Sequence, residues 1–94
     1  MIEFCNDDDG YLAWIGENPG GFVWHVRRQR DSTYVILHRA SCNSISSDLR
    51  TSGAYTARAY RKVCALNLEE LQLAARKEGR HDGSFSKKCS QCRP

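Results

Sequence analysis

Long hydrophobic runs are absent from this sequence of 94 residues. No apolar stretch approaches the roughly 20 residues of a membrane-spanning helix, so we expect no membrane span. The N-terminus also lacks the basic-then-apolar pattern of a secretory signal, which predicts a cytoplasmic protein. Thiols stay reduced in that compartment, and the odd number of cysteines, five, fits a disulfide framework poorly. We therefore expect cysteines that are free or that bind a metal.

Positive charge is missing from the first 26 residues, which contain five acidic residues and no lysine or arginine. All fourteen lysines and arginines lie between Arg27 and Arg93, among only six acids. A basic segment of this kind suits a polyanionic partner such as nucleic acid. A hydrated basic surface without such a partner would have the same composition, so both interpretations stay open.

The apolar content of 40% and the nine aromatic residues exclude a disordered tail. A chain of this length forms one domain with a marginal core, and small scaffolds often add a metal, disulfides or a partner. We expect a single zinc-binding domain over residues 1–94. An acidic helical segment covers residues 1–20, and a body with a sheet, a helix and a zinc knuckle covers residues 21–94.

An acidic triplet, residues 7–9, stands just before the apolar stretch 11–15. Acids in this position cap a helix and favour its positive N-terminal end. The segment 18–21, Asn-Pro-Gly-Gly, ends the helix. Capping explains the triplet better than a metal site or a mimic of nucleic acid does.

Three segments have the composition of strands. Residues 22–28 alternate between two faces, residues 33–38 are β-branched and aromatic, and the polar connection between them predicts a hairpin. Residues 43–53 form a loop, and residues 57–64 form the third strand.

The clearest helix lies over residues 67–78. Asn67 is a good N-cap, Glu70 completes a capping-box pattern, and Gly79 ends the helix. Its apolar stripe at helical spacing consists of Leu68, Leu71, Ala74 and Ala75. We therefore predict a small α+β fold: a three-stranded, mainly antiparallel sheet with one or two helices, held together by zinc.

The strongest chemical signal is the pair Cys89 and Cys92, separated by two residues. A tight turn of this kind presents both sulfurs to one tetrahedral ion. His38 and Cys42 supply a second close pair, where the second strand ends and the chain turns back. A nitrogen-and-sulfur donor set suits Zn²⁺. These four residues are the predicted metal ligands.

Two alternatives stay open at the cysteines. A redox motif needs its first cysteine at a helix N-terminus, and only two residues follow Cys92 in this sequence, which favours zinc. Cys64 could replace His38 as the fourth ligand, but a lone buried cysteine is ordinarily a small core residue. We read Cys5, His25 and His81 as non-ligands.

The spacing His38-x-x-x-Cys42, a capped helix and Cys89-x-x-Cys92-x-Pro94 resembles the Ada-like zinc-binding modules of bacteria. A longer set of residues, spread over residues 21–94, is similar to small bacterial zinc proteins. Some of those are associated with HNH nucleases or with restriction and phage-defence systems. The resemblance implies DNA binding in host–phage defence, and no HNH motif is present in this chain.

Ada itself moves a methyl group onto a zinc-bound cysteine, so the resemblance also raises a methyl-acceptor enzyme. One histidine and three cysteines give a zinc site of charge −1, which is less nucleophilic than an all-cysteine site of charge −2. We therefore expect no enzyme. If Cys64 were the fourth ligand, methyl transfer would become the better interpretation.

Nucleic acid, most simply DNA, is thus the expected partner, and a protein-interaction module or inhibitor is the alternative. Trp24 and Tyr60 are possible base-stacking residues. The predicted nucleic-acid contacts are Arg27, Arg28, Arg30, Arg58, Tyr60, Lys62, Lys87 and Lys88.

Overall fold

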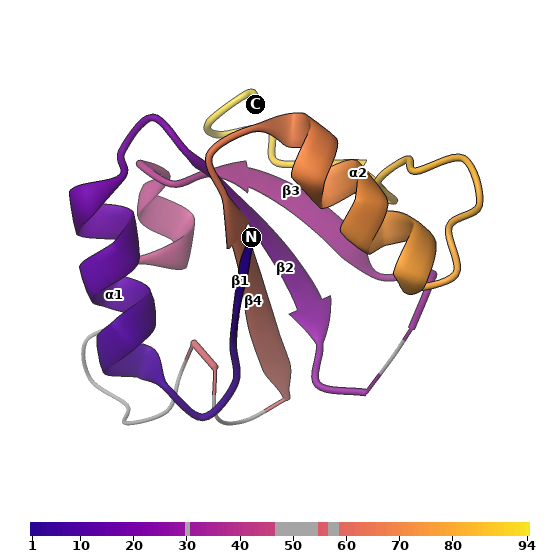
Figure 1. Ribbon diagram of the computed structural model, residues 1–94. Helices are drawn as coiled ribbons and strands as arrows, with labels where there is room; N and C mark the ends of the chain where they lie inside the picture. Colours follow the sequence, from indigo (N-terminus) through magenta and orange to yellow (C-terminus); the bar gives the residue numbers. More distant parts are fainter. Residues whose placement is uncertain (30, 47–54, 57–58) are drawn as a thin grey trace.

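The computed structural model describes residues 1–29, 31–46, 55–56 and 59–94. Two helices lie on a five-stranded sheet (Figure 1). In chain order the elements are β1 (Ile2–Phe4), α1 (Asp8–Glu17), β2 (Phe22–Arg27), β3 (Val35–Arg39), the 3-10 helix η1 (Asn43–Ile45), β4 (Tyr60–Ala65), α2 (Leu68–Lys77) and β5 (Lys87–Lys88).

The strands follow the spatial order β1-β4-β2-β3-β5. The predicted hairpin is confirmed as β2 and β3, with Val23 opposite His38 and Trp24 opposite Leu37. All neighbouring pairs are antiparallel except β3 and β5, which are parallel. The α+β class and the mainly antiparallel sheet are therefore confirmed.

The prediction of three strands is wrong, because β1 and β5 extend the sheet at its two edges. They contain three and two residues, which is too short for a period-two pattern to be recognised. Each of them is a strand because it pairs with a longer neighbour: β1 pairs with β4, and β5 pairs with β3. The predicted third strand is β4, which begins at Tyr60, and residues 57 and 58 lie outside the described residues.

The α2 helix agrees with its sequence signals. The Asn67 side chain accepts a hydrogen bond from the Glu70 N–H at 3.0 Å, which confirms the predicted cap. The chain leaves the helix through Gly79 at φ +103°, a conformation that glycine adopts without strain. On its inner face, Leu71 and Ala75 are fully buried.

The α1 helix is capped by its acidic triplet, as predicted. The Asp7 side chain accepts from the Gly10 N–H at 2.9 Å. Asp8, the next residue, has a different role. Its carboxylate accepts from the Thr56 N–H at 2.8 Å and from the Thr56 hydroxyl at 2.7 Å. The triplet therefore also fastens α1 to a segment nearly fifty residues further along the chain.

The helices cover opposite faces of the sheet and enclose two separate cores (Figure 1). On the α2 face the hydrophobic core includes Trp24, Leu37, Val63 and Leu71, and the ion pair of Arg61 and Glu78 is buried beside it. On the α1 face the core is mixed and includes the buried side chains of Phe4, Tyr11, Ile15, Val23, Cys42, Cys64 and Cys89. Within the part of the chain that the structure describes, neither helix has the length and apolar character needed to cross a membrane.

Candidate metal centre

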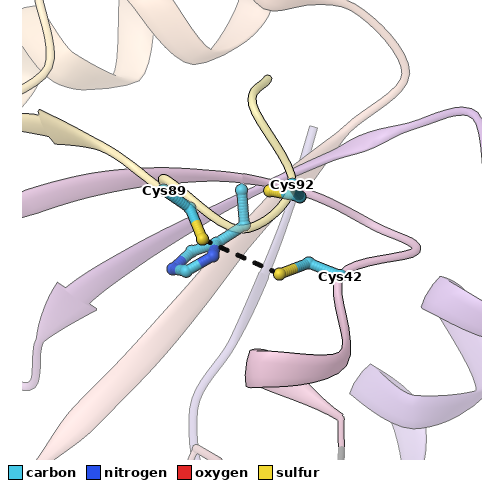
Figure 2. Close-up of side chains that lie close together, drawn as sticks. Cys42, Cys89 and Cys92 are labelled. Carbon is cyan, nitrogen blue, oxygen red and sulfur yellow. Dashed lines mark hydrogen bonds between the residues drawn. The ribbon is translucent and has the colours of Figure 1, made fainter.

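Four residues that the sequence singles out meet at one end of β3 (Figure 2). His38 lies on β3, Cys42 caps the start of η1, and Cys89 and Cys92 follow β5. The candidate ligand atoms of all four lie within 4.8 Å of one another. The structure therefore brings together a Cys3His cluster that could hold a metal ion.

The parallel pairing of β5 with β3 delivers the C-terminal segment to this place. Leu37 lies opposite Lys88, and the Cys89 N–H donates to the Leu37 carbonyl at 2.9 Å. Three residues before Cys89, the Ser86 N–H donates to the Val35 carbonyl at 2.9 Å. Backbone bonds thus bring Cys89 alongside the strand that carries His38.

Arg39 holds the second cysteine of the pair. Its backbone N–H donates to the Cys92 sulfur at 3.2 Å, and its Nε donates to the Cys92 carbonyl at 2.9 Å. Its Nη2 reaches the Arg93 carbonyl at 2.9 Å. One residue next to His38 therefore anchors the turn that contains Cys89 and Cys92.

The position of Cys42 depends on the α1 face. Cys42 begins η1, and the buried hydroxyl of Tyr11 on α1 donates to the carbonyl of Ile45 at the other end of η1, at 2.8 Å. Helix α1 therefore supports the third arm of the cluster.

The distances fit a tetrahedral ion of the size of zinc. The sulfurs of Cys42 and Cys89 lie 3.8 Å apart (Figure 2). Four ligands at Zn–S distances of about 2.3 Å place neighbouring sulfurs about 3.8 Å apart in a regular tetrahedron. The widest separation in the cluster, up to 4.8 Å, needs only a small inward movement to reach that value.

Metal binds neutral imidazole and thiolate, and the surroundings favour these forms at His38 and Cys89. At Cys92, burial raises the pKa to about 11 and favours the thiol. Burial lowers the pKa of His38 to about 4, so the ring is neutral at pH 7. Burial opposes ionisation of Cys89, but backbone N–H groups of Cys92 and Gln91 donate to its sulfur and lower its pKa to about 7. N–H groups that donate to sulfur stabilise the thiolate, which is the form of cysteine that binds a metal cation.

The other cysteines and histidines lie outside the cluster. Cys64 is fully buried in the core of the α1 face, and burial raises its pKa to about 12, as expected of a protonated core thiol. Cys5 and His81 are exposed. His25 is half-buried and its ring centroid lies 6.2 Å from that of His38.

A partly open hollow of about 320 Å³ adjoins the metal centre. His25, Tyr34 and Ile36 line it from the sheet, and Lys87 and Gln91 line it from the C-terminal segment. His38 and Cys89 form part of its wall, so the hollow reaches the cluster itself. No sequence pattern predicts this hollow, although the alternation of β2 does place His25 on the same face as Val23.

Aromatic rings and one cation form a ladder next to this hollow. The rings of His25 and Tyr60 lie 4.4 Å apart, and those of Tyr60 and Tyr34 lie 5.8 Å apart and are stacked. The guanidinium of Arg27 lies 4.4 Å from the centre of the Tyr34 ring. Arg27 also forms an ion pair with Asp31 at 3.1 Å.

The remaining residues that were predicted to contact nucleic acid differ in their exposure to solvent. Arg28, Lys87 and Lys88 are exposed, and Arg28 donates to the Asn6 side chain at 2.9 Å. Lys62 is buried, and its ammonium group donates to the Tyr55 carbonyl at 2.7 Å. Lys62 is therefore not a surface cation, because α1 and the segment 55–56 cover its face of the sheet.

Trp24 is also buried, at 1% exposure, under α2. The expectation that its ring stacks on bases is therefore wrong, whereas Tyr60 is half-exposed. Arg30 and Arg58 lie outside the described residues.

Comparisons of the chain with protein-family models, with curated proteins and with solved structures give no match. The function therefore has to be argued from the metal centre and from the surface beside it.

Proposed function

We propose that His38, Cys42, Cys89 and Cys92 bind one structural Zn²⁺ ion. Three points support zinc: the soft nitrogen-and-sulfur donor set, the sulfur separation of 3.8 Å, and the N–H groups directed at the sulfurs. Four protein ligands would complete the tetrahedral coordination of the ion and leave no position on it for a substrate. A closed four-ligand site of this kind is structural rather than catalytic.

The zinc proposal is tested by the metal content of protein purified without chelator. We expect about one equivalent of zinc per chain by elemental analysis, and a mass increase in native mass spectrometry that a zinc chelator removes. Metal-free protein that still unfolds cooperatively would refute it.

We further propose that the zinc-stabilised domain binds single-stranded nucleic acid. The observation that carries this proposal is the hollow beside the metal centre, with aromatic walls from His25 and Tyr34 and a cation, Lys87, at its edge. Single-stranded binders combine aromatic surfaces for unstacked bases with cations that follow the backbone. Arg27 is exposed beside Tyr34 at the same surface and supplies further positive charge.

A single strand suits this surface better than a duplex does. The ring walls belong to a concave site, and a base inside a duplex is stacked and cannot enter a hollow. The cations that would follow a duplex backbone are also fewer than the sequence predicts, because Lys62 is buried. Association with restriction or phage defence stays a prediction that rests on the resemblance to small bacterial zinc proteins alone.

The test is fluorescence anisotropy with a labelled single-stranded DNA of mixed sequence and with its duplex. We expect tighter binding to the single strand. With two or three phosphates neutralised, the log–log dependence of affinity on salt should have a slope of about −1.5 to −2. Tyr34→Ala should weaken binding by about 1–3 kcal/mol, the usual contribution of one stacked base.

Matched lysines provide the control. Lys87→Gln should reduce the salt slope by about 0.7, because one phosphate contact is lost. Lys77→Gln removes an exposed cation from α2, on the other side of the sheet, and should leave both affinity and slope unchanged. If neither DNA binds at about 50 mM salt, where electrostatic attraction is strong, a protein partner becomes the better proposal.

A further inference from the structure

A second cavity lies on the other face of the sheet, against the C-terminal half of α2. Its volume is about 320 Å³. The residues that shape it are Glu3 on β1, Arg61 and Val63 on β4, Trp24 on β2, and Ala74 and Glu78 from α2 and its C-cap. None of these residues belongs to the metal centre or to the hollow beside it.

Two residues of this cavity carry a buried polar atom that has no hydrogen-bond partner among the described residues. They are the indole Nε1 of Trp24, whose side chain is 1% exposed, and the carboxylate Oε2 of Glu78, which is 7% exposed. Unpaired buried polar groups are rare in folded proteins, because each one has lost its hydrogen bonds to water without replacement. One is a donor and the other is an acceptor, so a ligand that paired with both would offer one acceptor and one donor.

Arg61 balances the charge of the cavity. Its guanidinium is nearly buried and forms ion pairs with Glu78 and with Glu3, the latter at 3.1 Å. The exposed Lys77 at the rim offsets the second carboxylate. Met1 also lines the cavity, and its N-terminal ammonium is paired with Glu70 at 3.1 Å. Because these charges cancel, the cavity favours a neutral ligand over an anion or a cation.

We propose that this cavity binds a small, neutral, planar molecule in which an N–H group lies next to a carbonyl, as in a cyclic amide or a pyrimidine base. The carbonyl accepts from the Trp24 indole N–H, and the N–H group donates to Glu78. Val63 and Ala74 supply apolar contacts for the ring. A single water occupies only about 30 Å³, so one bridging water does not fill the space.

The inference does not depend on nucleic-acid binding, because the two cavities lie on opposite faces of the sheet. Trp24 and Val63 belong to the core of the α2 face, whereas the hollow beside the metal centre is lined by His25 and Ile36 on the alternate positions. A molecule bound under α2 would therefore leave the metal-side surface free. Failure of either proposal leaves the other standing.

The experiment is a titration of the ¹⁵N-labelled, zinc-loaded protein with uracil, followed by two-dimensional NMR. The chain has two tryptophans, and Trp24→Phe assigns the indole N–H signals by removing one of them. We expect uracil to shift the Trp24 indole signal in a saturable manner and to leave that of Trp14 in place. The control ligand is 1,3-dimethyluracil, which keeps the ring and the carbonyls but has no N–H donor.

Three outcomes would overturn the proposal: no shift of the Trp24 signal at millimolar uracil, equal shifts with 1,3-dimethyluracil, or equal shifts of both indole signals. The first would mean that the cavity holds water alone.

Variants then separate the two hydrogen bonds. Glu78→Gln weakens the acceptor, and we expect about a tenfold loss of uracil affinity, as for one hydrogen bond to a charged group. Glu69→Gln, an exposed position in the first turn of α2, should bind uracil as the wild type does. Trp24→Phe keeps an aromatic ring but removes the indole N–H donor. Saturation-transfer NMR should show loss of uracil binding. Unchanged binding by Glu78→Gln and Trp24→Phe would overturn the assignment of the site.

Discussion

The two faces of the sheet are stabilised in different ways. Under α2, Trp24, Val63 and Leu71 form a core of apolar side chains whose helix is capped by neighbouring residues. Under α1, cysteines take part in the core, and the Cys3His cluster joins β3 to a segment about fifty residues further along the chain. The α2 face is therefore held mainly by the packing of apolar side chains, whereas the metal face also brings together four polar ligand atoms from two distant segments.

The largest expected effect is the loss of the metal face on Cys89→Ser. Metal binding supplies about 10–16 kcal/mol of apparent folding free energy in small zinc peptides, so removal of one ligand should abolish the cooperative transition. Elemental analysis and thermal unfolding followed by circular dichroism would measure both losses. Cys5→Ser, at an exposed cysteine outside the cluster, is the matched control and should keep zinc and melting temperature. Retention of zinc by Cys89→Ser would show that the two faces do not differ in this way.

The corresponding change on the α2 face is Leu71→Ala. Leu71 is fully buried, and truncation of a buried leucine costs about 2–5 kcal/mol. We expect that loss in urea unfolding, with one zinc still bound per folded chain. Leu73→Ala on the same helix should change stability by less than about 0.5 kcal/mol, because Leu73 is 54% exposed. If Leu71→Ala released zinc under native conditions, the two faces would have to be regarded as one unit.

A smaller effect is expected at Cys64, which lies on the metal face but outside the cluster. Cys64→Ser should cost about 1–3 kcal/mol, because it buries a hydroxyl without an assured partner. Zinc stoichiometry should stay the same, whereas His38→Ala should abolish tight zinc binding. The reverse result would identify an all-cysteine site and would make methyl transfer the better proposal.

The smallest effect is a pH dependence from Lys62. Burial lowers the pKa of its ammonium group to about 8, below the ordinary value of 10.5. Between these values the unfolded chain binds more protons than the folded chain, so the free energy of unfolding should rise with pH, by at most about 1.4 kcal/mol per unit. This contribution is lost as the pH falls through about 8. Because cysteines titrate in the same range, the measurement is the difference between wild type and Lys62→Met in urea unfolding from pH 7.5 to 9.5. Equal slopes would show that Lys62 does not contribute.

The elements predicted well from sequence are those whose causes are local. Asn67 and Glu70 define the start of α2, and the alternation of residues 22–28 identifies β2. The Cys3His cluster was also predictable, because it consists of two pairs of residues that are each close in sequence. The strand β5 was not, since two lysines form a strand only where β3 offers its edge.

Burial of charge was the feature that sequence patterns could not supply. The alternation of β4 places Tyr60 and Lys62 on one face of the sheet. Which parts of that face are covered depends on α1 and on Tyr55, whose carbonyl binds Lys62. In the same way, Arg61 becomes buried because Glu3 and Glu78 approach it from two distant segments.

Arg39 has a consequence for the rate at which a bound metal would exchange. Cys92 is the most exposed of the four candidate ligands, so metal loss would begin with release of its sulfur. Three bonds from Arg39 keep the Cys92 turn in place, so the released sulfur would stay close to the ion and rebind before the next ligand leaves. A single arginine outside the coordination sphere would thus lengthen the lifetime of the complex, a kinetic property that the list of ligands alone does not contain.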